Sequence, residues 1–266
     1  MSKTQRWCLT QALPPLLMLV TVLVVWDRIV VSLDVKPYLV PRPGKVLEAA
    51  IDHARELRTA TMLTAAGAIS GFALSLIVGT LVALVFAQSK IIQRSLYPYA
   101  IFLQTVPIVA IAPIIIIWFG TGFQSVVVVA FIISLFPIIT NTTTGLTSID
   151  ASQLELFEMY NASRWQVLLK LRLPNAVPYL VTGAKISSGL SVIGAIVGEI
   201  SAGYGTNSFG LGYLISLTSG KLETAYSFAA MLCSTLLGVA VFSTASLVGN
   251  TVLARWHIGA PREVQT

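Results

Sequence analysis

An apolar stretch of the sequence, residues 177–200, contains two ionisable side chains, Lys185 near its start and Glu199 near its end. The stretch is long enough to cross a membrane, where charged groups are costly and usually serve the passage of solutes, ions or protons. We take Glu199 as the first candidate for such a role and Lys185 as the second. Two other interpretations stay open: Glu199 as a helix-end residue, capped or in contact with the outer solution, and Lys185 as a side chain that reaches the membrane surface.

Two neutral polar residues, Thr105 and Asn141, lie in other apolar stretches. Unpaired polar groups are expensive in lipid, so each needs a partner or water. Each therefore either lines a pathway or forms a hydrogen bond between helices.

The sequence lacks the residue patterns of common enzyme and metal sites. Its nearest approach to a phosphate-binding loop, SGKL at residues 219–222, has no Ser or Thr after Lys221 and has Ile215 where the first glycine belongs. His53 and His257 are isolated, without a second histidine at the spacing of a zinc site. We therefore expect no catalytic residue, and no metal or cofactor bound by this chain.

A charged, amphipathic segment interrupts the apolar sequence at residues 154–172. Its apolar residues recur every three to four positions in two groups, Leu154, Phe157 and Tyr160, then Trp165, Leu168 and Leu169. This spacing predicts two short helices. Between them, Asn161 tolerates a left-handed backbone and Ser163 can cap the second helix. We expect Pro174 and Pro178 to end that helix. The segment is either a helix pair lying on the membrane surface or an element that docks into a soluble partner.

Composition places the whole chain in a membrane. Of its 266 residues, 55% are hydrophobic and 11% are charged, against about 25% charged in ordinary globular domains. No soluble core of this size could bury so much apolar surface. The net charge of +6 is spread over loops and termini, a pattern typical of membrane topology. We expect contacts with membrane lipids and none with nucleic acid.

We expect six membrane-spanning helices with both termini on the inner side. They cover residues 10–31, 60–87, 97–119, 123–145, 177–200 and 225–253. Basic residues favour this orientation weakly in total and more clearly in the short loop QSKIIQRS, residues 88–95. The predicted units are a tail and first span (1–31), an outer connection ending in a short amphipathic helix (32–59), a transmembrane core with an inner loop at 146–176 (60–253), and an inner tail (254–266).

Glycine pairs and prolines indicate where the spans pack or bend. Gly67 with Gly71 and Gly194 with Gly198 form G-x-x-x-G pairs that allow helices to approach closely. They serve packing within one subunit or, alternatively, a subunit interface or moving gate. We expect kinks at the prolines of the third and fourth spans, Pro107, Pro113 and Pro137.

The amphipathic segment resembles the cytoplasmic EAA loop of binding-protein-dependent ABC importer permeases, whose pattern is E-A-A-x3-G-x9-I-x-L-P. The pattern aligns with this chain without a gap. Glu155 takes the acidic position, Leu156 and Phe157 take the two alanine positions, and Asn161 takes the glycine position. The closing I-x-L-P positions are taken by Leu171, Leu173 and Pro174. Downstream, GLSVIGAIVGEISAG and GLGYLI resemble the branch that imports nitrate, sulfonates, taurine and related small organic compounds. The resemblance covers the chain from about residue 60 to its end.

The resemblance implies an all-α fold with six transmembrane helices, the type I importer or MetI-like permease fold, in a bacterial inner membrane. It implies that the segment couples the chain to an ATPase through Glu155, Phe157, Tyr160, Asn161, Ala162, Trp165, Leu171, Leu173 and Pro174. The implied partners are a second copy of the chain, two cytoplasmic ATP-binding subunits that hold ATP and Mg²⁺, and an extracytoplasmic solute-binding protein. A self-sufficient carrier or channel is the alternative, disfavoured because the halves show no convincing inverted repeat.

Overall fold

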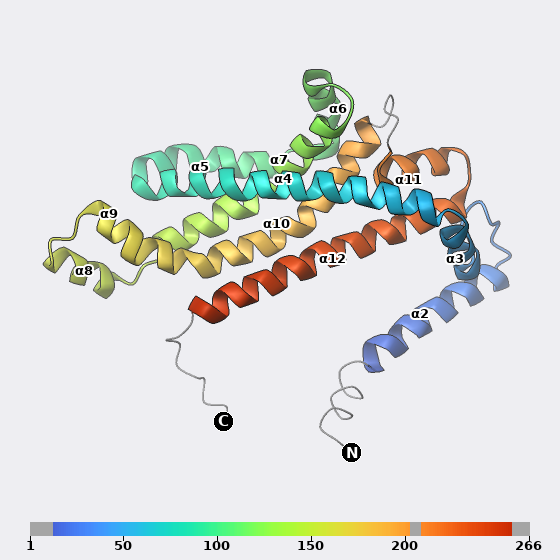
Figure 1. Cartoon of the computed structure of the whole chain (residues 1–266), viewed down its shortest axis with the longest axis horizontal. Coiled ribbons are helices and arrows are strands. Elements are labelled where there is room, and N and C mark those ends of the chain that lie inside the picture. The colour runs from blue at the N-terminus through green and yellow to red at the C-terminus, as the bar shows by residue number, and fades with distance from the viewer. Residues whose placement is uncertain (1–12, 203–208, 257–266) are drawn as a thin grey trace, which may run out of the picture.

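The computed structural model describes residues 13–202 and 209–256, and the elements within these ranges are helical. They form an elongated bundle whose two ends are marked by different short helices (Figure 1). One end carries α8 (Ala151–Met159) and α9 (Arg164–Val167), and the opposite end carries α3 (Pro43–Asp52) and α11 (Leu211–Gly220). The all-α class expected from the sequence is confirmed.

Three long helices form the centre of the bundle: α4 (Ala54–Gln88), α7 (Phe123–Thr147) and α10 (Leu173–Ala202). Both predicted glycine pairs face α7. A Cβ atom on Gly71 would lie 2.6 Å from the Cβ of Ala130, and one on Gly194 would lie 2.7 Å from the Cα of the same alanine. Glycine thus lets α4 and α10 both approach α7 closely. These contacts favour packing within the chain over the alternative of a subunit interface.

The remaining long helices flank this centre. The last helix, α12 (Thr224–Trp256), packs along α10 and contacts α3 and α11. The first described helix, α2 (Leu13–Ser32), diverges from the bundle (Figure 1). It contacts α3 near its end, where Asp27 forms an ion pair of 2.9 Å with Arg42, and Trp26 lies against Phe228 of α12.

The third expected span, residues 97–119, is not one continuous helix. It is divided into α5 (Lys90–Thr105) and α6 (Ile108–Phe119), with Val106 between them in an extended conformation. Pro107 explains the break, because proline donates no backbone hydrogen bond and disfavours a helical residue before it. Pro113 and Pro137, by contrast, lie inside helices. The expected loop at residues 88–95 is also mostly helical, since α5 begins directly after Ser89.

Pro174 and Pro178 do not end a helix, which corrects a second expectation. The chain is helical without interruption from residue 164 to residue 202, through α9, the π-helical turn η2 (Leu168–Arg172) and α10. A π turn changes the backbone hydrogen-bond pattern locally, and this one ends at Arg172, two residues before Pro174, which has no backbone N–H to donate. The amphipathic segment is therefore continuous with the central helix α10.

Other boundaries differ by a few residues. The second span begins at Ala54 rather than residue 60, and α11 occupies a stretch where no element was expected. The amphipathic helix expected before residue 59 is present as α3. The tail predicted from residue 254 begins within α12, and its residues from 257 lie outside the described part of the chain.

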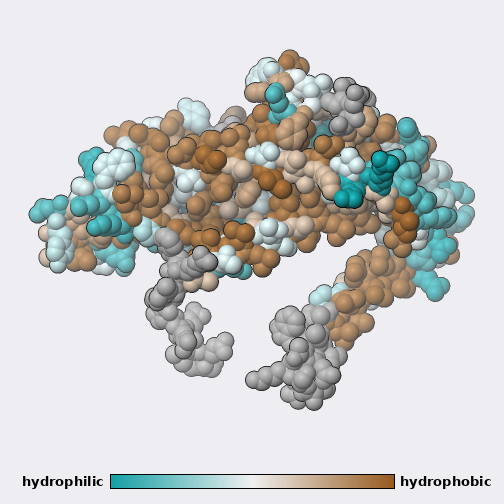
Figure 2. All heavy atoms as spheres, in the orientation of Figure 1, coloured by the Kyte–Doolittle hydropathy of each residue, from teal (hydrophilic) through white to brown (hydrophobic). Residues whose placement is uncertain are grey.

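The surface between the two ends of the bundle is apolar. Figure 2 shows hydrophobic residues across the middle of the molecule and hydrophilic residues gathered at both ends. Within residues 13–202 and 209–256, five helical stretches are long and apolar enough to cross a membrane, and Ile108–Phe119 is a shorter apolar helix. This distribution is that of a multi-pass membrane protein.

Candidate functional site

The turn between α8 and α9 has the local structure predicted from the sequence. Asn161 has a φ of +49°, the left-handed conformation that asparagine tolerates. Ser163 begins α9 with a capping box: its hydroxyl accepts from Gln166 N–H at 3.3 Å, and its own N–H donates to the Gln166 side chain at 2.7 Å. At the start of α8, Asp150 accepts from Ser152 N–H at 3.0 Å. Each short helix is therefore well defined by local hydrogen bonds.

Large apolar side chains project from this helix pair. Tyr160 is 79% exposed, Trp165 is 71% exposed and Met159 is 81% exposed. Phe157 and Ala162 are half-buried, and they line a hollow of about 280 Å³ together with Leu156, Tyr160, Gln166 and Lys170. Glu155 is exposed on α8. Aromatic side chains around a hollow are the usual anchors of a protein interface.

The base of the helix pair is fixed to the centre of the bundle. Leu168 is buried among apolar residues of α4, α7 and α10. The guanidinium of Arg172 donates to the carbonyl oxygen of Ala87, in the last turn of α4, at 2.7 Å. The amide of Asn175 donates to the carbonyl oxygens of Gly145 and Ser148, at the end of α7, at 2.8 Å each. The helices α4, α7 and α10 are thus joined where the segment meets them.

The remaining residues assigned to the segment lie at this base. Leu171, Leu173 and Pro174 are half-buried, at the transition from η2 to α10. They belong to the root of the segment, whereas Glu155, Tyr160 and Trp165 belong to its exposed face.

Glu199 lies at the opposite end of α10 and is 6% exposed. Its carboxylate oxygen Oε2 accepts from the Thr64 hydroxyl at 2.9 Å and from Gly212 N–H at 2.8 Å. The Leu211 N–H donates to Thr64 Oγ1 at 2.9 Å. Glu199 is therefore buried and caps α11, a helix that the sequence analysis did not predict. Contact of Glu199 with the outer solution, one of the interpretations left open, does not fit this burial, and a role in passage stays a prediction.

Of the other candidate pathway residues, Lys185 contacts another helix, whereas Asn141 and Thr105 bond to their own helices. The ammonium of Lys185 donates to Asn250 of α12 at 2.9 Å. Asn141 donates to the carbonyl of Pro137 at 2.8 Å, and Thr105 donates to that of Phe102 at 2.8 Å. These two hydrogen bonds of Asn141 and Thr105 lie within their own helices rather than between helices.

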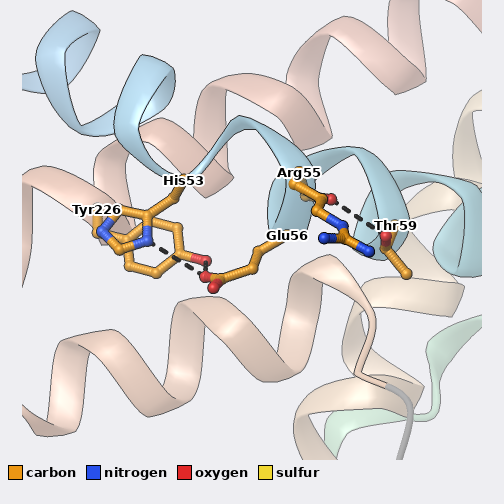
Figure 3. Close-up of polar contacts among 5 residues, drawn as sticks. All are labelled: His53, Arg55, Glu56, Thr59 and Tyr226. Carbon is orange, nitrogen blue, oxygen red and sulfur yellow. Dashed lines mark hydrogen bonds and ion pairs between the residues drawn. The ribbon is translucent and has the colours of Figure 1, made fainter.

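A polar cluster at the α3–α4 corner was missed by the sequence analysis, which treated His53 as isolated. The His53 ring stacks on Tyr226 with centroids 4.0 Å apart, and Glu56 contacts both, at 3.2 Å from His53 Nδ1 and 2.9 Å from the Tyr226 hydroxyl (Figure 3). Arg55 precedes Glu56 on α4, and Thr59, one turn further on, donates to the Arg55 carbonyl at 3.1 Å. All five residues line a cavity of about 770 Å³. No local signal predicts the cluster, because residues 53 and 226 are far apart in sequence.

These features define a class of protein: an all-helical, multi-pass membrane protein with an exposed helix pair rigidly joined to its central spans. Residues 71–256 match the family described as binding-protein-dependent transport system inner membrane component, and the chain belongs to this family.

Individual relatives agree with the family. The chain is 34% identical over 244 residues to the formylaminopyrimidine transport permease protein ThiX of Halalkalibacterium halodurans, covering 91% of this chain and 96% of the relative. It is 33% identical over 197 residues to the riboflavin transport system permease protein RibX of Chloroflexus aurantiacus, covering 74% and 72%.

Among solved structures, an inward-facing MetNI methionine ABC transporter matches with a TM-score of 0.56 at 20% identity, covering 76% of this chain and 95% of that one. The MetI-like fold is therefore confirmed. The chain is an inner-membrane permease subunit of an ABC importer, and it is not itself an enzyme.

Proposed function

We propose that a cytoplasmic ATPase subunit docks on the α8–α9 pair, and we call this docking site the ATPase seat. The observation that carries this proposal is the combination of exposed aromatic side chains with a rigid base. Tyr160 and Trp165 are 79% and 71% exposed at the end of the bundle, while the same segment continues without a break into α10. Burying such side chains in a groove stabilises an interface.

The connections at the base give the seat a mechanical role. A displacement of α8 and α9 passes into α10 through continuous helix, into α4 through Arg172 and into α7 through Asn175. Packed helices move as rigid elements rather than deforming smoothly. One docking element therefore moves all three central helices together.

The alternative is a helix pair that lies on the membrane surface. That arrangement needs a continuous apolar face turned toward lipid. The hollow beside Phe157 is lined by polar as well as apolar groups, among them Gln166 of α9 and Lys170 of η2. A mixed hollow of this kind suits a protein partner, with Glu155 exposed beside it for polar contacts.

The complete importer in this proposal contains two copies of the chain, two ATPase subunits that bind ATP and Mg²⁺, and an extracytoplasmic binding protein. The transported solute is a small organic or anionic compound. The names of three relatives support this class. ThiX and RibX are named for the transport of formylaminopyrimidine and riboflavin, and SsuC of Bacillus subtilis, which is 28% identical, is named for aliphatic sulfonates. Two copies are proposed because one chain of this size encloses only half of a pathway.

Co-purification of the ATPase tests the seat. The complex is isolated in detergent with the chain either unchanged or carrying Tyr160→Ala with Trp165→Ala. We expect the variant to insert normally and lose its ATPase. Normal retention of the ATPase would refute the proposal, and weaker membrane insertion with retained ATPase would support the surface helix instead.

A further inference from the structure

The N-terminus of α11 is held by side chains from two other helices. Its first residues follow Gly210, which as a glycine offers no capping side chain. The missing acceptors come from Glu199 of α10, bonded to Gly212 N–H at 2.8 Å, and from Thr64 of α4, bonded to Leu211 N–H at 2.9 Å. A carboxylate suits this place because the free N–H groups and the dipole of a helix N-terminus favour negative charge.

Hydrogen bonds and close glycine contacts hold this end of α11, and Leu211, which is 0% exposed, also packs with Leu57 and Ala60 of α4 in a buried apolar cluster. A Cβ atom on Gly210 would overlap the Glu199 carboxylate, and one on Gly212 would overlap the carbonyl oxygen of Ile196. The carboxylate has no basic partner among the described residues, although burying an acid is costly. A permanent helix end could be capped more cheaply by a serine or asparagine at position 210. A buried carboxylate without a basic partner is costly to keep in a permanent contact, and it suits a contact that forms and breaks.

The other end of α11 is joined differently. The hydroxyls of Ser219 and Ser227 lie 2.8 Å apart, and Glu223 N–H donates to the Thr218 carbonyl at 2.9 Å. The first residue of α12, Thr224, donates to the carbonyl of Tyr38 at 2.7 Å. A short turn therefore fastens this end of α11 to α12 and to the segment before α3.

We propose that Glu199 is a positioning residue of an outer gate: it holds the N-terminus of α11 against α10 and α4 in one state of the transport cycle and releases it in the other, while the Ser219 end acts as the hinge. This proposal rests on the proposed function as an importer. Alternating access requires that elements at each end of the pathway adopt two discrete positions. The end of the bundle that carries α11 lies opposite the ATPase seat (Figure 1).

Disulfide cross-linking tests the release directly. Thr64→Cys with Leu211→Cys reports the held end, and Ser219→Cys with Ser227→Cys is the matched control at the hinge. Both pairs are placed in a chain with Cys8→Ser and Cys233→Ser, assembled with its ATPase in lipid. Oxidation is compared without nucleotide and after trapping with MgATP and orthovanadate. On trapping, we expect the disulfide yield at the held end to fall at least about fivefold, because fewer molecules have α11 docked. The disulfide yield at the hinge should stay constant.

The contrary results are clear. Equal yields at the held end in both states would show a static contact, and absence of the cross-link in both would show that α11 is not docked there. Either overturns the proposal. ATPase retention and vanadate inhibition, measured on the same samples, report separately on the proposed function.

A second arm uses the chain without nucleotide. With Glu199→Gln in the held-end pair, the neutral amide caps α11 more weakly, so we expect slower cross-linking at residues 64 and 211 and no change at the hinge pair. If Glu199 has only a structural role, Glu199→Gln should lower the yield of folded protein and leave both cross-linking rates unchanged in the folded fraction. Unchanged rates at both cysteine pairs would overturn the proposal.

Discussion

The guanidinium of Arg172 donates a hydrogen bond of 2.7 Å to the carbonyl oxygen of Ala87. The bond joins the root of the α8–α9 pair to the last turn of α4, where helix carbonyls lack partners within the helix. The bond connects residues 85 positions apart in the sequence, and in the proposed function it is the contact through which movement of the segment reaches α4.

The first prediction follows from this bond. Arg172→Met should lower the melting temperature of the detergent-solubilised chain by about 2–6 °C, because a hydrogen bond from a charged donor contributes up to about 1.5–3 kcal/mol and this site is half-buried. Arg164→Met, at an exposed position of α9, is the control and should leave the melting temperature unchanged. Equal melting temperatures for both variants would contradict the structural importance of the bond.

The second prediction concerns the ATPase seat. Tyr160→Ala with Trp165→Ala should weaken ATPase binding by more than about tenfold, since burying each aromatic anchor contributes roughly 1.5–3 kcal/mol. Glu155→Ala should cost less, because an exposed ion pair contributes only about 0–1 kcal/mol. Binding is measured by titrating the ATPase onto purified chain in detergent.

The control for the seat is Trp118→Ala. Trp118 is 72% exposed, as Trp165 is 71% exposed, but it lies on α6, away from the α8–α9 pair. Its removal should leave ATPase binding intact. If Trp118→Ala and the double variant weaken binding equally, loss of exposed aromatic surface in general, rather than of the seat, is responsible.

Features set by local sequence could be predicted. The break at Asn161 and the cap at Ser163 depend on residues within a few positions, and both are present. The G-x-x-x-G pairs also indicated close helix contact, although the sequence does not say that both pairs would face the same helix, α7. Hydrophobic runs located the other spans, because membrane thickness sets their length, but they did not show that the third expected span is divided into α5 and α6.

Features set by distant contacts could not be predicted. The helix α11 is too short for a span, and its N-terminus depends on Glu199 and Thr64, which lie on other helices. Proline was ambiguous for the same reason: Pro107 divides a span, whereas Pro174 and Pro178 lie within a continuous helix. Tertiary packing decides whether the free backbone groups beside a proline find other partners.

A third prediction concerns membrane orientation. Cysteines at Lys90 and Ser152 should react with an impermeant maleimide only from the cytoplasmic side, and one at Lys221 only from outside. All three positions are exposed, whereas Thr218, on the same side of the bundle as Lys221, is 1% exposed and unsuitable. Labelling is measured on right-side-out and inverted vesicles. Reaction of Ser152→Cys from outside would exclude a cytoplasmic ATPase as its partner.

A fourth prediction concerns the centre of the bundle. Gly71→Ala should destabilise the chain by about 1–3 kcal/mol, because the new methyl group would lie 2.6 Å from Ala130 Cβ and 2.9 Å from the backbone nitrogen of Phe131. Gly238→Ala, within α12, meets no atom within 4 Å and should leave stability unchanged or raise it slightly. Thermal unfolding in detergent measures both, and a stability gain for Gly71→Ala would show that α4 and α7 are not so closely packed.

The last prediction concerns Asn161, which stands where the resembling loop pattern has glycine. Its φ of +49° explains the correspondence, since glycine and asparagine both adopt this conformation. Asn161→Gly should therefore retain the ATPase. Asn161→Val should cost about 1–2 kcal/mol in the left-handed conformation and turn α8 away from α9, weakening ATPase binding by about fivefold to thirtyfold. Gln153→Val, exposed on α8, controls for the branched side chain itself. Equal ATPase titration curves for Asn161→Val and Gln153→Val would show that the left-handed turn does not orient the seat.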